Sequence, residues 1–184
     1  KEAASIVDEK KKTLSTSKDS AETLKQIQTA SESLKSSADQ LTNTGKDSVF
    51  SKSQDEIYKA VDSFVSNYNK LIEGSAKSAS DSITKRVDTL KNMTESNQKL
   101  LGQAGITIGK DDTLTLDKDA FAKADANTVK TLFSGSYSYA SRVSSQSSFI
   151  DFAATQEAAK ANTYTTKGTY SNTYASGNIF NSYF

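Results

Sequence analysis

Residues 53–72 read SQDEIYKAVDSFVSNYNKLI, and their pattern decides the fold class. The apolar positions step alternately by four and three residues, which places them on one narrow face of an α-helix. They are Ile57, Val61, Phe64, Tyr68 and Leu71, with Val65 and Ile72 widening the stripe. Ser53 and Glu56 have the spacing of a capping box, so the helix is expected to begin at Ser53. Gly74 is expected to end it.

The same spacing recurs on both sides of this stretch. From about Ala3 to Thr42 no glycine or proline interrupts the chain, and a helix is expected there with the seam Leu24, Ile27, Ser31, Leu34, Ala38 and Leu41. A third helix is expected from about Ser78 to Gly102, and its apolar face carries Ile83, Val87, Leu90, Met93 and either Leu100 or Leu101. A final helix is expected over residues 136–161, where Tyr139, Val143, Ile150, Ala153 and Glu157 follow near-heptad spacing and Phe149 and Phe152 flank them.

Residues 106–116 break the helical pattern. Two short runs rich in β-branched side chains surround a turn of Gly, Lys and Asp, which predicts a small β-hairpin. Asp117 is then expected to cap a short helix through Phe121, and Asn127 another through Phe133. The sequence therefore predicts a mainly α fold: an elongated, coiled-coil-like bundle of three or four long helices with a small β-hairpin, forming one domain over residues 1–161.

Residues 162–184 form a polar segment that carries aromatic side chains. Tyr, Thr, Asn, Ser and Gly dominate it, no helical stripe is present, and Phe180, Tyr183 and Phe184 close it. Large aromatic side chains in so polar a segment need a surface to cover them. Either they fold back on the helices or another protein binds them, and we expect the segment to be an interaction segment.

Composition excludes several functional classes. The chain has 23 basic and 22 acidic side chains, mixed along its length, so nucleic acid is a poor partner. No apolar run is long enough to cross a bilayer. Cys and His are both absent, which removes thiol nucleophiles and the usual thiolate and imidazole metal ligands. We therefore expect no enzyme activity, no cofactor and no metal.

Two groups of side chains have a functional and a structural interpretation. Asp111, Asp112, Asp117 and Asp119 could bind calcium, but turn residues and a helix cap explain them without a metal. Phe64, Tyr68, Phe121, Leu132 and Phe133 could form a binding surface, but the helical spacing favours a place in the core.

Two motifs occur in a fixed order along the chain. The first is a helix with Phe-Val-x-x-Tyr-Asn, and the second is Gly-Ile-Thr, a turn, Leu-x-Leu-Asp and then Val-x-x-Leu-Phe. The matching residues are Phe64, Val65, Tyr68, Asn69, Gly105, Ile106, Thr107, Leu114, Leu116, Asp117, Val129, Leu132 and Phe133. In this order they resemble the carboxy-terminal domain of flagellar filament cap proteins, the hook-associated protein 2 family, over roughly residues 53–143.

This resemblance implies helices bundled with a small β element, export through the flagellar secretion apparatus, and assembly by terminal helices. We therefore expect a non-enzymatic structural or accessory protein of a bacterial flagellum-like assembly. Its partners would be further copies of itself or flagellar components, and it would be cytoplasmic before export and extracellular or flagellar after it. The alternative is a secreted or cell-surface helical binding or adhesion module.

Overall fold

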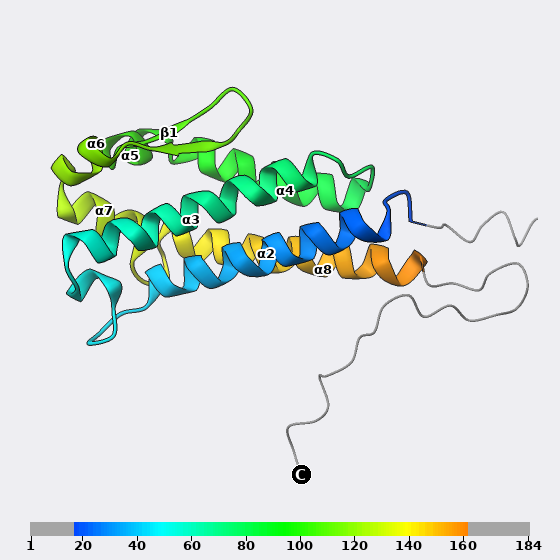
Figure 1. Cartoon of the computed structure of the whole chain (residues 1–184), viewed down its shortest axis with the longest axis horizontal. Helices are drawn as coiled ribbons and strands as arrows, with labels where there is room; N and C mark the ends of the chain where they lie inside the picture. Colours follow the sequence, from blue (N-terminus) through cyan, green and yellow to red (C-terminus); the bar gives the residue numbers. More distant parts are fainter. Residues whose placement is uncertain (1–16, 162–184) are drawn as a thin grey trace, which may run out of the picture.

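A computed structural model describes residues 17–161 of the chain. This part is mainly helical and carries one two-stranded antiparallel sheet, as the sequence predicts (Figure 1). The elements in chain order are α2 (Ala21–Thr42), the 3-10 turn η1 (Val49–Ser51), α3 (Gln54–Ser75), α4 (Asp81–Ser96), α5 (Gln98–Gln103), β1 (Ile106–Ile108), β2 (Leu114–Leu116), α6 (Lys118–Lys123), α7 (Ala126–Phe133) and α8 (Tyr139–Ala161).

Helix α2 lies between α3 and α8, and α4 packs against α8 (Figure 1). The predicted seam of α2 is buried in these contacts. Its residues Leu24, Ile27 and Leu34 have no exposed surface. Helices α2 and α8 are antiparallel: Gln28 on α2 donates to Thr155 on α8, whereas Asp39, further along α2, accepts from Ser144, which is earlier on α8.

The ends of the described segment lie together. Figure 1 shows the start of α2 and the end of α8 at the same end of the helical body. The short elements α5, α6, α7 and the hairpin lie toward the other end of the helical body, where α3 begins. Strand β2 packs on α3, and β1 packs on α5. The register pairs Ile106 with Leu116 and Ile108 with Leu114.

Helix α3 begins as predicted, and its last residue differs slightly. Ser53 accepts from the backbone N–H of Glu56, and the Glu56 carboxylate accepts from the N–H of Ser53, which completes the capping box. Gly74 does not end the helix, because α3 continues to Ser75. The Ser75 hydroxyl donates to Leu71 O at 2.6 Å, so a polar side chain near the terminus bonds back to the preceding turn.

Other helix boundaries also differ from the prediction: α4 begins at Asp81 and not at Ser78, and α8 begins at Tyr139 and not at residue 136. Within the described residues the first helix begins at Ala21, because Ser20 caps it by accepting from Thr23 N. The predicted helix from Ser78 to Gly102 is two helices, because the Asn97 side chain donates to Met93 O at 2.7 Å and competes with the backbone ladder. The cap of α7 is Asp125, which accepts from Thr128 N at 2.9 Å, and not Asn127.

Candidate functional site

The residues that carry the resemblance meet where α3 contacts the hairpin. Asn69 donates from its amide to Leu114 O at 2.8 Å and accepts from Leu114 N at 2.7 Å. Asp117 accepts from Ala120 N at 2.7 Å and caps α6, as predicted. Gly105 has φ 77°, and a Cβ there would lie 2.7 Å from Phe121 N, so only glycine fits without strain.

A buried aromatic cluster joins α3, α7 and α8. The rings of Phe64, Phe133 and Tyr139 pack edge to face, with centroids 5.5 to 6.5 Å apart. The hydroxyl groups of Tyr139 and Thr94 lie 2.9 Å apart, and Thr94 also donates to Leu90 O. Burial raises the pKa of Tyr139. This cluster is core, and the predicted core positions Tyr68, Phe121 and Leu132 are buried with it.

The hydroxyl of Tyr68 is buried next to this cluster without a hydrogen-bond partner. Burial raises its pKa to about 12, and the nearby Thr94 hydroxyl offsets a part of that shift. The two hydrogen bonds of Thr94 nevertheless go to Leu90 and Tyr139. The Tyr68 oxygen is therefore a polar atom whose burial costs stability.

Asp111 and Asp117 near the hairpin have turn and cap roles, and Asp119 lies in the first turn of α6. Asp111 accepts from Thr113 N and from the Thr113 hydroxyl inside the turn. Asp112 has φ 63° and pairs with Lys91 at 3.0 Å. Within residues 17–161, no group of three or more acidic side chains is arranged to hold a metal ion.

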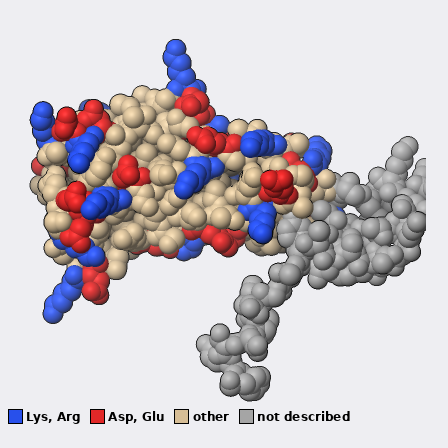
Figure 2. Space-filling model, viewed as in Figure 1, with Lys and Arg blue, Asp and Glu red and all other residues tan. Residues whose placement is uncertain are grey.

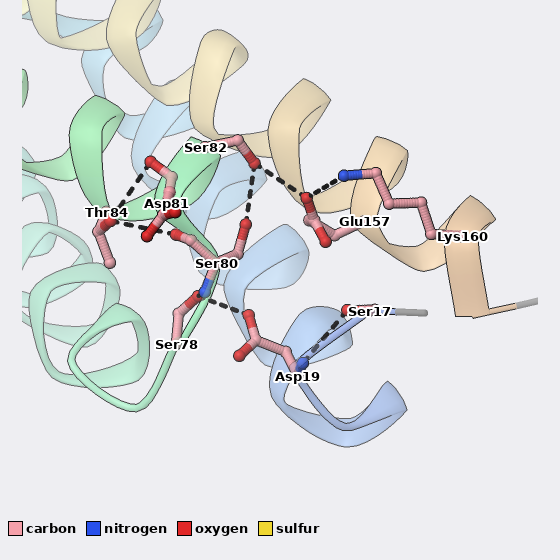
Figure 3. A network of polar contacts seen from close by, with 9 residues as sticks. All are labelled: Ser17, Asp19, Ser78, Ser80, Asp81, Ser82, Thr84, Glu157 and Lys160. Carbon is pink, nitrogen blue, oxygen red and sulfur yellow. Dashed lines mark hydrogen bonds and ion pairs between the residues drawn. The ribbon is translucent and has the colours of Figure 1, made fainter. Parts of the chain in front are cut away.

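A polar network closes the end of the helical body where the described segment begins and ends (Figure 3). The Asp19 carboxylate accepts from Ala79 N at 2.6 Å and from the Ser78 hydroxyl at 2.5 Å. Because Asp19 precedes α2 and Ser78 precedes α4, these bonds join two chain segments that are about sixty positions apart. Asp19 is largely buried, so the bonds are shielded from water.

The same network continues to α8. The Ser78 hydroxyl accepts from Ser80 N, and the Ser80 and Ser82 hydroxyls lie 2.9 Å apart. Ser82 donates to Glu157 at 3.2 Å, and Lys160 donates to the same carboxylate oxygen at 2.6 Å (Figure 3). The Lys160 and Ser82 bonds hold the pKa of Glu157 below its usual value, although burial opposes them. The spacing of α8 predicts Glu157 on the helix seam, but no local pattern indicates its partners.

A groove of about 550 Å³ lies between α4 and α8, next to this network. Its walls include Phe149 and Phe152, which are 47% and 62% exposed. These side chains are three positions apart on α8 and therefore lie on one face. The Arg86 guanidinium on α4 lies 5.1 Å from the centre of the Phe149 ring, a cation–π contact. This is the most exposed pair of neighbouring aromatic side chains on the described helices.

Charges of both signs are mixed on the surface in the view of Figure 2, and no stripe of one sign follows a helix there. None of the helices within residues 17–161 has the length and the hydropathy needed to span a membrane. Phe180, Tyr183 and Phe184, singled out as interaction residues, lie outside the described residues.

The fold and these contacts define a mainly helical protein whose first and last described helices pair and whose hairpin is fixed to α3. Comparison with protein-family models, with curated proteins and with solved structures finds no match.

Proposed function

We propose that the chain is a non-enzymatic structural or accessory component of a bacterial flagellum-like assembly. It acts through helix-mediated contacts with other protein chains, either copies of itself or flagellar components. The long helices form an elongated, coiled-coil-like bundle that serves as the rigid body of this component. The observation that carries the proposal is the antiparallel pairing of α2 with α8, held by contacts such as Gln28 with Thr155.

This pairing supports an assembly role because it brings the two ends of the described segment to one end of the body (Figure 1). The resemblance to cap proteins implies assembly by terminal helices, and α2 and α8 are the first and last helices of the described residues. The network of Asp19, Ser78 and Glu157 fastens this end through hydrogen bonds. A fixed geometry there lowers the entropy that a joining subunit must lose.

The motif residues support the proposal in a second way. Asn69, Gly105 and Asp117 belong to the two motifs of the resemblance, and each has a specific local role at the hairpin. These contacts give each of the three residues a physical role at its own position. They bear on the fold, whereas the flagellar location rests on the resemblance.

The experiment is fractionation of the source cell. Surface filaments are sheared off and sedimented, and the chain is followed by an antibody in the filament, envelope and cytosolic fractions. The proposal predicts sedimentation with the flagellar filaments and loss from that fraction in a strain without flagella. A variant with Gly105→Ala, which disturbs the hairpin, should sediment less than one with Gly102→Ala, where a Cβ meets nothing within 4 Å.

Two results would contradict the proposal. Recovery with the envelope, unchanged in the strain without flagella, would favour the alternative of a secreted or surface binding or adhesion module. Recovery in the cytosol alone would contradict both functions.

A further inference from the structure

The groove between α4 and α8 exposes two aromatic rings that the described part of the chain leaves half uncovered. Phe149 and Phe152 present an apolar face, and the α4 wall beside it carries Lys85 and Arg86 and, at its start, Asp81. Exposed aromatic pairs at the edge of a hollow are typical of a surface that another segment covers.

The composition of residues 162–184 fits this surface. The segment carries Tyr164, Tyr170, Tyr174, Phe180, Tyr183 and Phe184, and its only charged side chain is Lys167. Aromatic faces attract guanidinium and ammonium groups, which the α4 wall supplies, and the segment brings no acidic group that would need another partner.

The groove is also close to the point where the segment begins. Residue 162 follows directly after α8, and Phe152 lies nine residues before the end of that helix at Ala161. Nine helical residues span about 14 Å, which about five extended residues cover after a turn. Residues 162–184 can therefore reach the whole groove, and the tether keeps their effective concentration near the millimolar range.

We propose that residues 162–184 fold back along α8 and place aromatic side chains of their last seven residues in the groove beside Phe149, Phe152 and Arg86. The groove is thus covered in cis in the isolated chain. The inference is independent of the flagellar assignment, because it concerns a contact within one chain.

The absence of cysteine from the sequence permits a clean test. The full chain is prepared with Thr89→Cys in the groove wall and Asn181→Cys near Phe180. The matched control combines Asn181→Cys with Thr29→Cys on α2. Thr89 and Thr29 are both exposed, and each lies eight positions after the first residue of its helix, Asp81 or Ala21. Both helices begin at the end where α8 finishes (Figure 1).

Oxidation of dilute protein is followed on non-reducing gels and by peptide mass spectrometry. The proposal predicts that the Thr89 pair forms an intramolecular disulfide about tenfold faster than the Thr29 pair, because docking raises its effective concentration. Adding Phe152→Ser, a change at an exposed position, should slow the Thr89 pair to the control rate while far-UV circular dichroism stays unchanged.

Three results would overturn the proposal. Equal rates for the two pairs would show that the segment does not prefer this groove. Disulfide-linked dimers as the main product would show that a second copy supplies the segment. A rate that Phe152→Ser leaves unchanged would show that the aromatic face does not hold it.

Discussion

Asn69 on α3 binds the backbone of Leu114 on β2 as a neighbouring strand would. Its amide donates to Leu114 O and its Oδ1 accepts from Leu114 N, at 2.8 and 2.7 Å. The facing pair in the hairpin, Ile108 with Leu114, leaves these backbone groups pointing outward, because Gly109 and Thr113 form the adjacent hydrogen-bonded pair. One side chain therefore satisfies both backbone groups of Leu114 on the open edge of the sheet and fixes β2 to the helix.

Replacing Asn69 should weaken this junction. We expect Asn69→Ala to lower the free energy of unfolding by about 1–3 kcal/mol, because two half-buried backbone groups lose their partner. Asn69→Asp keeps the acceptor for Leu114 N but sets a carboxylate oxygen against Leu114 O, so it should cost at least as much at neutral pH. Urea unfolding measures the energy, and hydrogen exchange measures the protection of the Leu114 amide. Unchanged protection in both variants would contradict the strand-like role.

Gly105 is expected to tolerate no side chain. Its φ of 77° and the 2.7 Å approach of a Cβ to Phe121 N leave no room, since the backbone cannot give way as a flexible side chain does. Gly105→Ala should lower the free energy of unfolding by about 1–3 kcal/mol or more. Gly102→Ala, in the exposed part of α5, should instead raise it by up to about 1 kcal/mol. Thermal unfolding of both variants provides the comparison, and equal effects would show that φ and crowding at Gly105 do not matter.

Local features were predictable from the sequence, and contacts between distant segments were not. The seam with Leu34, the capping box of Ser53 and the cap at Asp117 depend on residues close in sequence, and the structure confirms them. The helix break at Asn97 was missed because an apolar stripe continues through it, although an Asn side chain can compete for backbone groups. Asp125 and Asn127 are both good caps, so spacing alone could not choose between them.

At the candidate site, too, residue types could be predicted from the sequence, and contacts between distant segments could not. The aromatic character of Phe149 and Phe152 was visible beside the α8 stripe, but the position of Arg86 on the Phe149 ring depends on how α4 packs against α8. The bonds from Asp19 to Ser78 and Ala79 likewise depend on the placement of three chain segments. No local spacing encodes these approaches, because they result from the burial of helix faces that are far apart in sequence.

The two buried tyrosine hydroxyls should respond differently to removal. Tyr139→Phe deletes the bond to Thr94 and should cost about 1 kcal/mol. Tyr68→Phe removes an oxygen without a partner, so stability should change by less than about 0.5 kcal/mol or increase. Because the folded pKa of Tyr68 is raised from 10.0 to about 12, its contribution is complete below pH 10 and is lost as the pH rises toward 12. Tyr68→Phe should therefore lose less stability over this interval, as measured by urea unfolding at pH 9 and 12. Equal losses in the two proteins would contradict the shift.

Asp151 on α8 should destabilise the fold at neutral pH. Burial raises its pKa, and the charge of Glu32 on α2 raises it further. A folded-state pKa above the unfolded one means that the stability linked to this group is present below the unfolded pKa and is lost as the pH rises through the folded pKa. At pH 7 the carboxylate is charged in an unfavourable place, so Asp151→Asn should stabilise the protein, by less than about 1 kcal/mol because the site is partly solvated. At pH 3 the gain should disappear, since both states are then largely protonated.

Asp39 on α2 is the matched control for Asp151, because its pKa is shifted in the opposite direction. Burial raises its pKa, but the hydrogen bonds from Lys35 and Ser144 outweigh that effect and hold the pKa below its usual value. Its contribution is therefore present above the unfolded pKa and is lost as the pH falls through the folded pKa. Asp39→Asn should destabilise the protein at pH 7, and this loss should shrink only as the pH falls through the lowered folded pKa. Urea unfolding of both variants at pH 7 and pH 3 checks the pair of signs. A destabilising Asp151→Asn at pH 7 would mean that its carboxylate makes a favourable contact, and burial and Glu32 would then not set its ionisation.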